Sequence, residues 1–328
     1  MNLNLLEQVN KASHIAISGH IRPDGDCVGA VLATYLYLKK MLPEAEVKAY
    51  LEQPAEIFGN IKGFDAICTS IDEAAEPDVF IVLDCTKDRL GFSEVLFERA
   101  AKTINIDHHI SNSGCGDVNF VVPTASATCE VLYDVIGKDA MDAEIAEALY
   151  IGIIHDTGVL QYSNTSPKTL RIAADLVEFG FDFSDIIQKT FYEKTYIQTQ
   201  ILGRALLESF RFMDGRCVVS SVTRKEMNFY GVTPKDLDGI VNHLRNIKGV
   251  DCAIFMYETG VLEYKVSMCS SGKVDVSKVA VIFGGGGHVR AAGCTMNGTM
   301  HDVVNNLSLH IEKQLLEADA ADCEGEAV

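Results

Sequence analysis

The chain has 328 residues, 48% hydrophobic and 23% charged, which is the composition of an ordinary folded protein with room for two domains. Its formal net charge of −18 argues against a protein that coats long nucleic acid through a broad basic face. No apolar run is long enough to cross a bilayer, and the amino terminus lacks the pattern of a secretion signal. The ten cysteines form no Cys-x-x-Cys pair, which excludes a thiolate zinc motif of that kind. We therefore expect a cytoplasmic protein that does not enter the membrane.

The first half of the chain alternates short apolar strands with helical stretches. Strands are predicted at 14–18, 46–51, 65–69, 79–83 and 102–106, and helices at 28–41, 142–155 and 167–179. Phe80-Ile81-Val82-Leu83 is apolar throughout, which is typical of a strand covered on both faces. The alternation predicts a mostly parallel sheet flanked by helices, in which ligands bind beyond the carboxyl ends of the strands.

The second half predicts a smaller α/β domain. Its strands are expected at 217–222, 252–257 and 262–268, and its helices at 234–246, 276–283 and 300–316. A mostly polar helical stretch is expected to connect the two domains. The predicted organisation is an α/β protein with a first domain at 1–182, a helical linker at 183–209, a second domain at 210–316 and an acidic flexible tail at 317–328.

Histidines and aspartates gather where the strands and helices of the first half end. We interpret them as one metal site with two imidazoles and four carboxylates: His20, Asp24, Asp26, Asp84, His108 and Asp156. Oxygen-rich sites with a minority of nitrogen ligands suit Mn²⁺ or Mg²⁺ better than structural zinc. Two ions about 4 Å apart can clamp a phosphoryl group, and Asp84 is the natural carboxylate to bridge them.

Simpler interpretations of these residues stay open. Asp24 and Asp26 open a helix and can act as helix caps. Asp107 can orient His108 without binding the metal directly. Cys27 and Cys85 are expected to be small core residues, and His155 to be packed or exposed.

Four consecutive glycines, Gly284–Gly287, precede His288 in the second half. Such a run costs conformational entropy on folding. It makes sense where backbone N–H groups approach a phosphate or a nucleotide closely, and His288 would then donate to the substrate. A flexible hairpin is the alternative interpretation.

Together these segments resemble the DHH phosphoesterase superfamily in its two-domain DHH–DHHA1 branch. The resemblance runs from His20 to Gly293 and rests on His-x-x-x-Asp-x-Asp, a strand-end Asp, Asp-His-His and Asp-Thr-Gly. Length and the lack of further domains resemble the NrnA-type enzymes, which are bifunctional oligoribonucleases and 3′-phosphoadenosine-5′-phosphate (pAp) phosphatases.

The resemblance implies two Mn²⁺ ions, with Mg²⁺ or Co²⁺ as other candidates. One ion would be held by His20, Asp24 and Asp84, and the other by Asp26, Asp84, His108 and Asp156. It implies catalytic roles for His109, Asp84 and Asp107, and substrate binding by Arg22, His109, Gly285, Gly286, Gly287 and His288. The second domain would act as a lid over an interdomain cleft. Family analogy alone suggests a homodimer.

One departure from the family pattern stands at Ser267-Met268-Cys269-Ser270, where relatives usually have Ser-x-Arg-Ser. Our leading hypothesis is a Mn²⁺-dependent phosphohydrolase that degrades very short RNA to mononucleotides or removes phosphate from pAp. Its partners would be short RNA or nucleotide phosphoesters. The alternatives are a phosphodiesterase of linear or cyclic dinucleotides (c-di-AMP, pApA or pGpG), an inorganic pyro- or polyphosphatase, and a non-catalytic nucleotide-binding protein.

Overall fold

The computed structural model describes residues 4–72 and 74–325, with the backbone alone for 321–325. The chain divides into two compact units, Met1–Glu193 and Lys194–Val328. The division falls inside the stretch that we expected to be a linker. Helix α7 (Phe183–Ile187) and the π-helical turn η6 (Gln188–Tyr192) belong to the first unit, and α8 (Tyr196–Leu207) belongs to the second.

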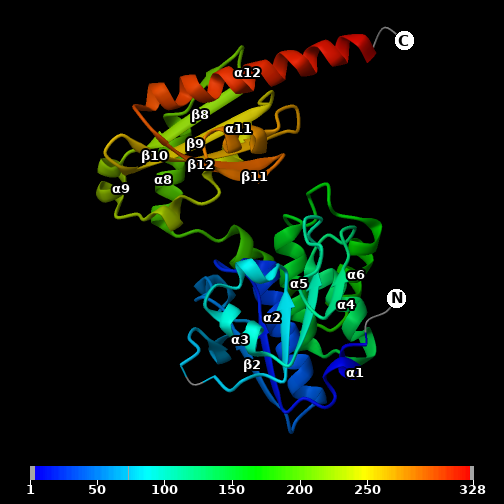
Figure 1. Cartoon of the computed structure of the whole chain (residues 1–328). Helices are drawn as coiled ribbons and strands as arrows, with labels where there is room; N and C mark the ends of the chain where they lie inside the picture. Colours follow the sequence, from blue (N-terminus) through cyan, green and yellow to red (C-terminus); the bar gives the residue numbers. More distant parts are fainter. Residues whose placement is uncertain (1–3, 73, 326–328) are drawn as a thin grey trace. The chain divides into compact units, whose positions relative to one another are not determined.

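The first unit is built on a six-stranded sheet in which every pair of neighbours is parallel (Figure 1). The strands lie in the order β3-β2-β1-β4-β5-β6, with bounds β1 (His14–Ser18), β2 (Glu46–Tyr50), β3 (Ile67–Cys68), β4 (Val79–Leu83), β5 (Lys102–Asp107) and β6 (Val118–Val121). The predicted parallel sheet is thus confirmed. The strand order runs outward in opposite directions from β1 and β4, and such a switch point is where α/β sheets form their ligand crevice.

Helices cover both faces of this sheet. On one face, α2 (Gly25–Met41), α4 (Thr128–Ile136) and α5 (Ala143–Asp156) pack against inward-facing residues such as Ile17 and Ile104. On the other face, Phe97 of α3 (Glu94–Arg99) packs edge-on to Phe80, with ring centroids 5.8 Å apart. Two short elements, α1 (Leu5–Val9) and α6 (Pro167–Val177), extend the first of these layers.

Helix α4 was not predicted, and its first turn shows why. Ala127 precedes the helix and has no side chain that could cap it, so the usual start signal is missing from the local sequence. By contrast, α6 begins as predicted, because Ser166 forms a capping box with Thr169 and Pro167 occupies the first turn.

The second unit has a mixed sheet in the order β11-β12-β10-β9-β8-β7. Its strands are β7 (Phe210–Phe212), β8 (Cys217–Val222), β9 (Cys252–Gly260), β10 (Glu263–Ser270), β11 (Gly286–His288) and β12 (Ala291–Asn297). Strands β8 and β9 are parallel, and the other neighbours are antiparallel. One face is covered by α11 (Val276–Ile282) and α12 (Met300–Gly325), and the other by α8, α9 (Arg224–Tyr230) and α10 (Ile240–Arg245).

Helix α12 runs to Gly325, so the predicted end of this helix at Leu316 is wrong. Leu315 is buried in the core of the unit, and Asp319 forms an ion pair with Arg216. These contacts hold the helix to the sheet beyond the point where its sequence becomes acidic and Ala-rich. The last part of the predicted tail, 326–328, lies outside the described residues.

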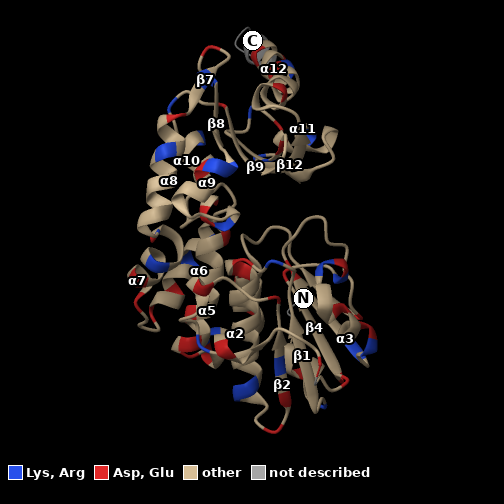
Figure 2. Cartoon of the chain, turned by 90° about the vertical axis from the view of Figure 1, so that its left-hand side faces the viewer, with Lys and Arg blue, Asp and Glu red and all other residues tan. Residues whose placement is uncertain are grey.

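Charged residues are spread along the helices of both units (Figure 2). Within the part of the chain that the structure describes, no helix is both long and apolar enough to span a membrane. Four carboxylates of the first unit are at most 2% exposed: Asp26, Asp84, Asp107 and Glu130. Glu130 accepts hydrogen bonds from the hydroxyls of Ser126 and Thr169. Buried carboxylates need partners, and the other three, Asp26, Asp84 and Asp107, lie at the carboxyl edge of the sheet.

Candidate metal centre

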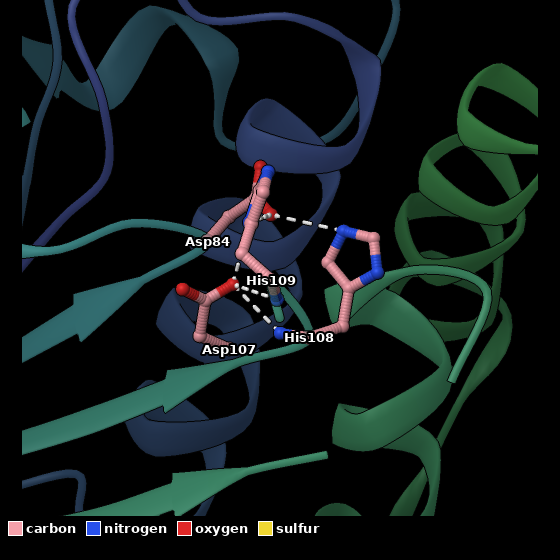
Figure 3. A group of neighbouring side chains, drawn as sticks. All are labelled: Asp84, Asp107, His108 and His109. Carbon is pink, nitrogen blue, oxygen red and sulfur yellow. Dashed lines mark hydrogen bonds and ion pairs between the residues drawn. The ribbon is translucent and has the colours of Figure 1, made fainter. Parts of the chain in front are cut away.

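Three adjacent parallel strands deliver the central residues. His20 follows β1, Asp84 follows β4 directly, and Asp107 is the last residue of β5 and precedes His108 and His109. Because β1, β4 and β5 are neighbours, their carboxyl ends lie side by side. Figure 3 shows how the side chains at the ends of β4 and β5 meet there. Helix α2 adds Asp24 and Asp26 from its amino end, and α5 adds Asp156 as its last residue.

His20 presents one ring nitrogen to two carboxylates. Its Nδ1 lies 2.9 Å from the carbonyl oxygen of Ile21. Its Nε2 lies 3.6 Å from Oδ1 of Asp24 and 3.4 Å from Oδ2 of Asp84. A ring that donates its Nδ1–H to a carbonyl keeps the lone pair of Nε2 for a metal.

His108 has the same arrangement toward the other carboxylates. Its Nδ1 lies 3.2 Å from the carbonyl oxygen of Ala125. Its Nε2 faces Oδ2 of Asp156 at 3.1 Å, Oδ1 of Asp84 at 3.7 Å and Oδ2 of Asp26 at 4.0 Å. Each histidine therefore faces the carboxylates that were predicted to share an ion with it, while the binding of the ions stays a prediction.

Asp84 belongs to both groups. Its Oδ2 faces His20, and its Oδ1 faces His108 and accepts a hydrogen bond from Oγ1 of Thr128 at 2.9 Å. Its backbone is left-handed, with φ +60°, which costs a non-glycine residue about 1–2 kcal/mol. The backbone N–H still donates to Ile106 at 3.1 Å. Strain held at such a position is typical of a functional residue, and the two-sided orientation suits a bridging carboxylate.

Asp24 and Asp26 are helix caps as well as members of this cluster. Asp24 caps its own helix, since its Oδ1 accepts from the backbone N–H groups of Asp26 and Cys27 at 3.1 Å each. Asp26 caps a different helix: its oxygens accept from Thr128 at 2.6 Å and Cys129 at 3.0 Å, in the first turn of α4. A carboxylate oxygen has two lone pairs, so capping and metal binding are compatible.

Asp107 holds the ring of His109, whereas it contacts His108 through the backbone N–H and not through the ring. Its Oδ1 accepts from Nδ1 of His109 at 2.8 Å and from the backbone N–H groups of His108 and His109 (Figure 3). Its Oδ2 accepts from Nδ2 of Asn112 at 2.6 Å. The His108 ring is held by Ala125 because the turn after β5 points it away from the Asp107 carboxylate.

Electrostatics show why this cluster suits cations. Burial raises the pKa of Asp26 well above its ordinary value, and repulsion from Asp84 and Asp156 raises it further. Burial raises the pKa of Asp84 as well, against the favourable contact with His20. Asp26 and Asp84 are thus held in their charged forms at a cost that positive charge would remove.

The histidines respond in the opposite sense. Burial alone would lower the pKa of His108, but the hydrogen bond to Asp156 and the attraction of Asp26 raise it to about 10. Burial also opposes the charged form of His20, yet contacts with Asp24 and Asp84 raise its pKa. The protein alone would therefore bind protons here, and divalent ions would supply the same charge.

All six predicted ligands come together in this way. Three sets of ligand atoms each lie within 4.8 Å of one another: His20, Cys27 and Asp84; Asp26, His108 and Asp156; and Asp84, Asp107, His108 and His109. Asp24 joins the cluster through its Oδ1, which lies 3.6 Å from Nε2 of His20. Cys27 is fully buried, as expected of a core residue, although its sulfur belongs to the first set. The donor set fits divalent metal ions. No sequence pattern indicated Thr128 and the carbonyl of Ala125, which orient Asp84 and His108, or Asn112, which bonds to Asp107.

Arg22 was predicted to bind substrate, and Cys269 stands where relatives usually have an arginine. Arg22 is exposed beside the cluster, with φ +54° and its N–H 2.8 Å from Oε2 of Glu52. Cys269 on β10 is 6% exposed, with its sulfur 3.4 Å from Oδ1 of Asn242. Substrate binding by Arg22 stays a prediction.

The glycine run leads into a hairpin between β11 and β12. Gly286 pairs with Gly293, and His288 with Ala291. A Cβ at Gly285 would lie 2.2 Å from the carbonyl oxygen of Gly293, and one at Gly287 would lie 2.5 Å from that of Ala291. Close approach to β12 thus requires glycine at both positions, whereas a Cβ at Gly286 would meet nothing within 4 Å. Substrate binding by Gly285–His288 stays a prediction.

A parallel sheet with buried Asp and His residues gathered at its carboxyl edge defines an α/β protein with a candidate site for metal-assisted hydrolysis. Residues 14–153 match the N-terminal domain of the DHH family, and residues 214–316 match the DHHA1 domain. The chain belongs to the DHH/DHHA1 phosphoesterases.

Three relatives illustrate how similar this chain is to known proteins. It is 29% identical over 305 residues to the bifunctional oligoribonuclease and PAP phosphatase NrnA of Thermus thermophilus, covering 90% of this chain and 89% of that protein. The crystal structure of an exopolyphosphatase-related protein from Bacteroides fragilis is similar with a TM-score of 0.87 and 25% identity, over 96% of each chain. RecJ of Thermus thermophilus, solved in complex with Mn²⁺, shares the fold with a TM-score of 0.54 and 11% identity, over 95% of this chain and 54% of RecJ.

Proposed function

We propose that this phosphoesterase hydrolyses very short RNA to mononucleotides, or removes phosphate from pAp, with the help of two divalent metal ions. The observation that carries the proposal is the convergence of two His–Asp groups on Asp84, whose oxygens face His20 at 3.4 Å and His108 at 3.7 Å. Similarity to the NrnA protein of Thermus thermophilus over 90% of the chain supports the choice of substrate.

The first ion would be held by His20, Asp24 and Asp84, and the second by Asp26, Asp84, His108 and Asp156. Mn²⁺ fits this oxygen-rich donor set with two imidazoles, and the RecJ structure with Mn²⁺ supports the choice. Divalent ions bound in this way supply Lewis-acid charge to a phosphoryl group.

His109 is the proposed proton donor to the leaving oxygen. The hydrogen bond to Asp107 raises the pKa of His109. That bond occupies Nδ1, so Nε2 is the ring atom left to face substrate, and the side chain is 30% exposed. General-acid catalysis needs a protonated group at hydrogen-bonding distance from the leaving atom. Exposed Arg22 is the proposed contact for a substrate phosphate.

Short substrates fit the charge of the chain. A net charge of −18 opposes the binding of a long polyanion, whose affinity rests on neutralising many phosphates. A dinucleotide or pAp carries few phosphates, and the metal-binding cluster can hold these without an extended basic surface.

A substrate panel tests the proposal. The purified protein with Mn²⁺ is offered pAp, a 5′-labelled RNA dimer, a long RNA, cyclic di-AMP, pGpG and polyphosphate. We expect mononucleotide release from the dimer, much slower attack on the long RNA, and phosphate release from pAp. Turnover restricted to cyclic di-AMP, pGpG or polyphosphate would contradict the proposed substrate, and no turnover of any compound would contradict the proposed hydrolysis.

A further inference from the structure

A buried amide pair connects the turns that follow β4 and β5. Asn105 lies in the middle of β5 and is 0% exposed. Its Nδ2 donates to the carbonyl oxygen of Cys85 at 2.9 Å, directly after Asp84. Its Oδ1 accepts from Nδ2 of Asn112 at 2.9 Å, and Asn112 is 6% exposed. The two amides therefore link the Asp84 turn to the segment that follows His109.

Asn112 also reaches the carboxylate that holds His109. Its Nδ2 donates to Oδ2 of Asp107 at 2.6 Å, while Oδ1 of Asp107 accepts from Nδ1 of His109 at 2.8 Å. The backbone N–H of Asn112 donates to the carbonyl of His109, and its Oδ1 accepts from the N–H of Gly114 at 2.7 Å. The side chain is thus fixed at both ends, and both oxygens of Asp107 are occupied.

Such a network is rigid because none of its members can rotate without leaving a buried polar group unpaired. Asp107 is 0% exposed, so in the intact protein its Oδ2 is bonded to Asn112 and not to bulk water. Loss of the Asn112 amide would let the carboxylate turn about its Cβ–Cγ bond. The bond from Oδ1 to the His109 ring would then lose its geometry.

We propose that Asn112 and Asn105 are positioning residues for the hydrolysis proposed above, on which this inference rests. They fix the Asp107 carboxylate so that Nδ1 of His109 keeps its hydrogen bond and Nε2 is held toward the substrate. Through the carbonyl of Cys85 they also set the separation between the His109 ring and Asp84. Neither asparagine touches substrate, and both act through Asp107.

A double-mutant cycle in Mn²⁺-loaded enzyme tests this role. Asn112→Ala should lower kcat about 10–100-fold, as loss of a residue behind a catalytic side chain typically does, with little change in KM. In a His109→Ala background the same substitution should have no further effect, because its target is gone. Equal losses in both backgrounds would overturn the proposal.

The matched control is Asn119→Ala. Asn119 is an exposed residue of the neighbouring strand β6, and its side-chain amide bonds to the backbone of Gly116 instead of to Asp107. It should leave kcat unchanged. Should Asn112→Ala fail to fold, Asn105→Ala removes the other anchor of Asn112 and is expected to give a loss in the same direction.

A second readout needs no turnover, so its failure and that of the proposed function are distinguishable. In metal-free protein, proton NMR should show a downfield, slowly exchanging Nδ1–H resonance, assigned to His109 by its loss in His109→Gln. We expect this resonance to persist in Asn119→Ala and to disappear in Asn112→Ala. An unchanged resonance in folded Asn112→Ala would overturn the positioning role.

Discussion

Replacement of Asp84 by asparagine tests the centre of the proposed site. The amide keeps the size of the side chain, and asparagine tolerates the left-handed φ of +60°. Because burial raises the pKa of Asp84, its charged form is disfavoured in the metal-free protein. We therefore expect Asp84→Asn to melt no lower than the wild type without metal, and to have no detectable turnover with it.

The magnitude follows from ligand linkage. A site filled at one hundred times its Kd stabilises the folded state by about 2.7 kcal/mol, so two sites give about 5.5 kcal/mol. For a unit of this size, each kcal/mol shifts Tm by about 2–4 °C, so Mn²⁺ should raise the wild-type Tm by about 10–20 °C. Asp84→Asn should lose nearly all of that shift, because its oxygens face both histidines.

Asp156→Asn provides the comparison. Asp156 contacts His108 at 3.1 Å, whereas Nε2 of His20 faces Asp24 and Asp84, so about half of the Mn²⁺ shift should remain. The exposed Asp65→Asn, outside the cluster, should keep all of it. The measurement is thermal unfolding across a Mn²⁺ titration. If Asp84→Asn keeps as large a shift as Asp156→Asn, the bridging assignment is refuted.

Three further predictions concern the surroundings of the site. Thr128→Val removes the hydroxyl that donates to Asp84 and should weaken metal-linked stabilisation by about 1.5–3 kcal/mol, with Thr128→Ser restoring it in the same titration. Metal binding must displace the proton of His108, whose pKa is about 10, so Mn²⁺ affinity should rise with pH below that value. Calorimetry in buffers of different ionisation enthalpy would measure this release, and the absence of proton release at neutral pH would contradict it. In the hairpin, Gly285→Ala should lower the free energy of unfolding by about 1–3 kcal/mol, because the added Cβ meets a backbone oxygen. Gly286→Ala should have the Tm of the wild type and a raised KM. An unchanged KM would count against substrate binding at this hairpin.

The strands that carry the site were predictable because their sequence is apolar and ends in a polar residue. Strands β1 and β4 have their predicted bounds, and β5 extends one residue further, to Asp107. Once a parallel sheet is inferred, residues at adjacent carboxyl ends must meet. The sequence alone therefore predicted that His20, Asp84 and His108 lie together.

The parts that escaped prediction depend on contacts distant in sequence. Helix α4 is capped by Asp26, which is distant in sequence, and the residues around Ala127 contain no pattern that predicts the start of a helix. The pairing of Gly285 and Gly287 with β12 depends on hairpin register, which the glycine run alone does not set. Asn105 did leave a signal, since a polar residue between Ile104 and Ile106 is unusual within a buried strand.

The double use of Asp26 bears on how inactive variants of this protein should be made. Its two oxygens cap the amino end of α4 by accepting hydrogen bonds from the backbone N–H groups of Thr128 and Cys129, and one of them also faces His108. Asp26→Ala would remove the cap of α4 and a candidate metal ligand at the same time. Loss of activity in that variant could therefore come from altered folding as much as from altered catalysis. Asp156 takes part in no such cap, which makes it the cleaner place to silence the enzyme in a cell.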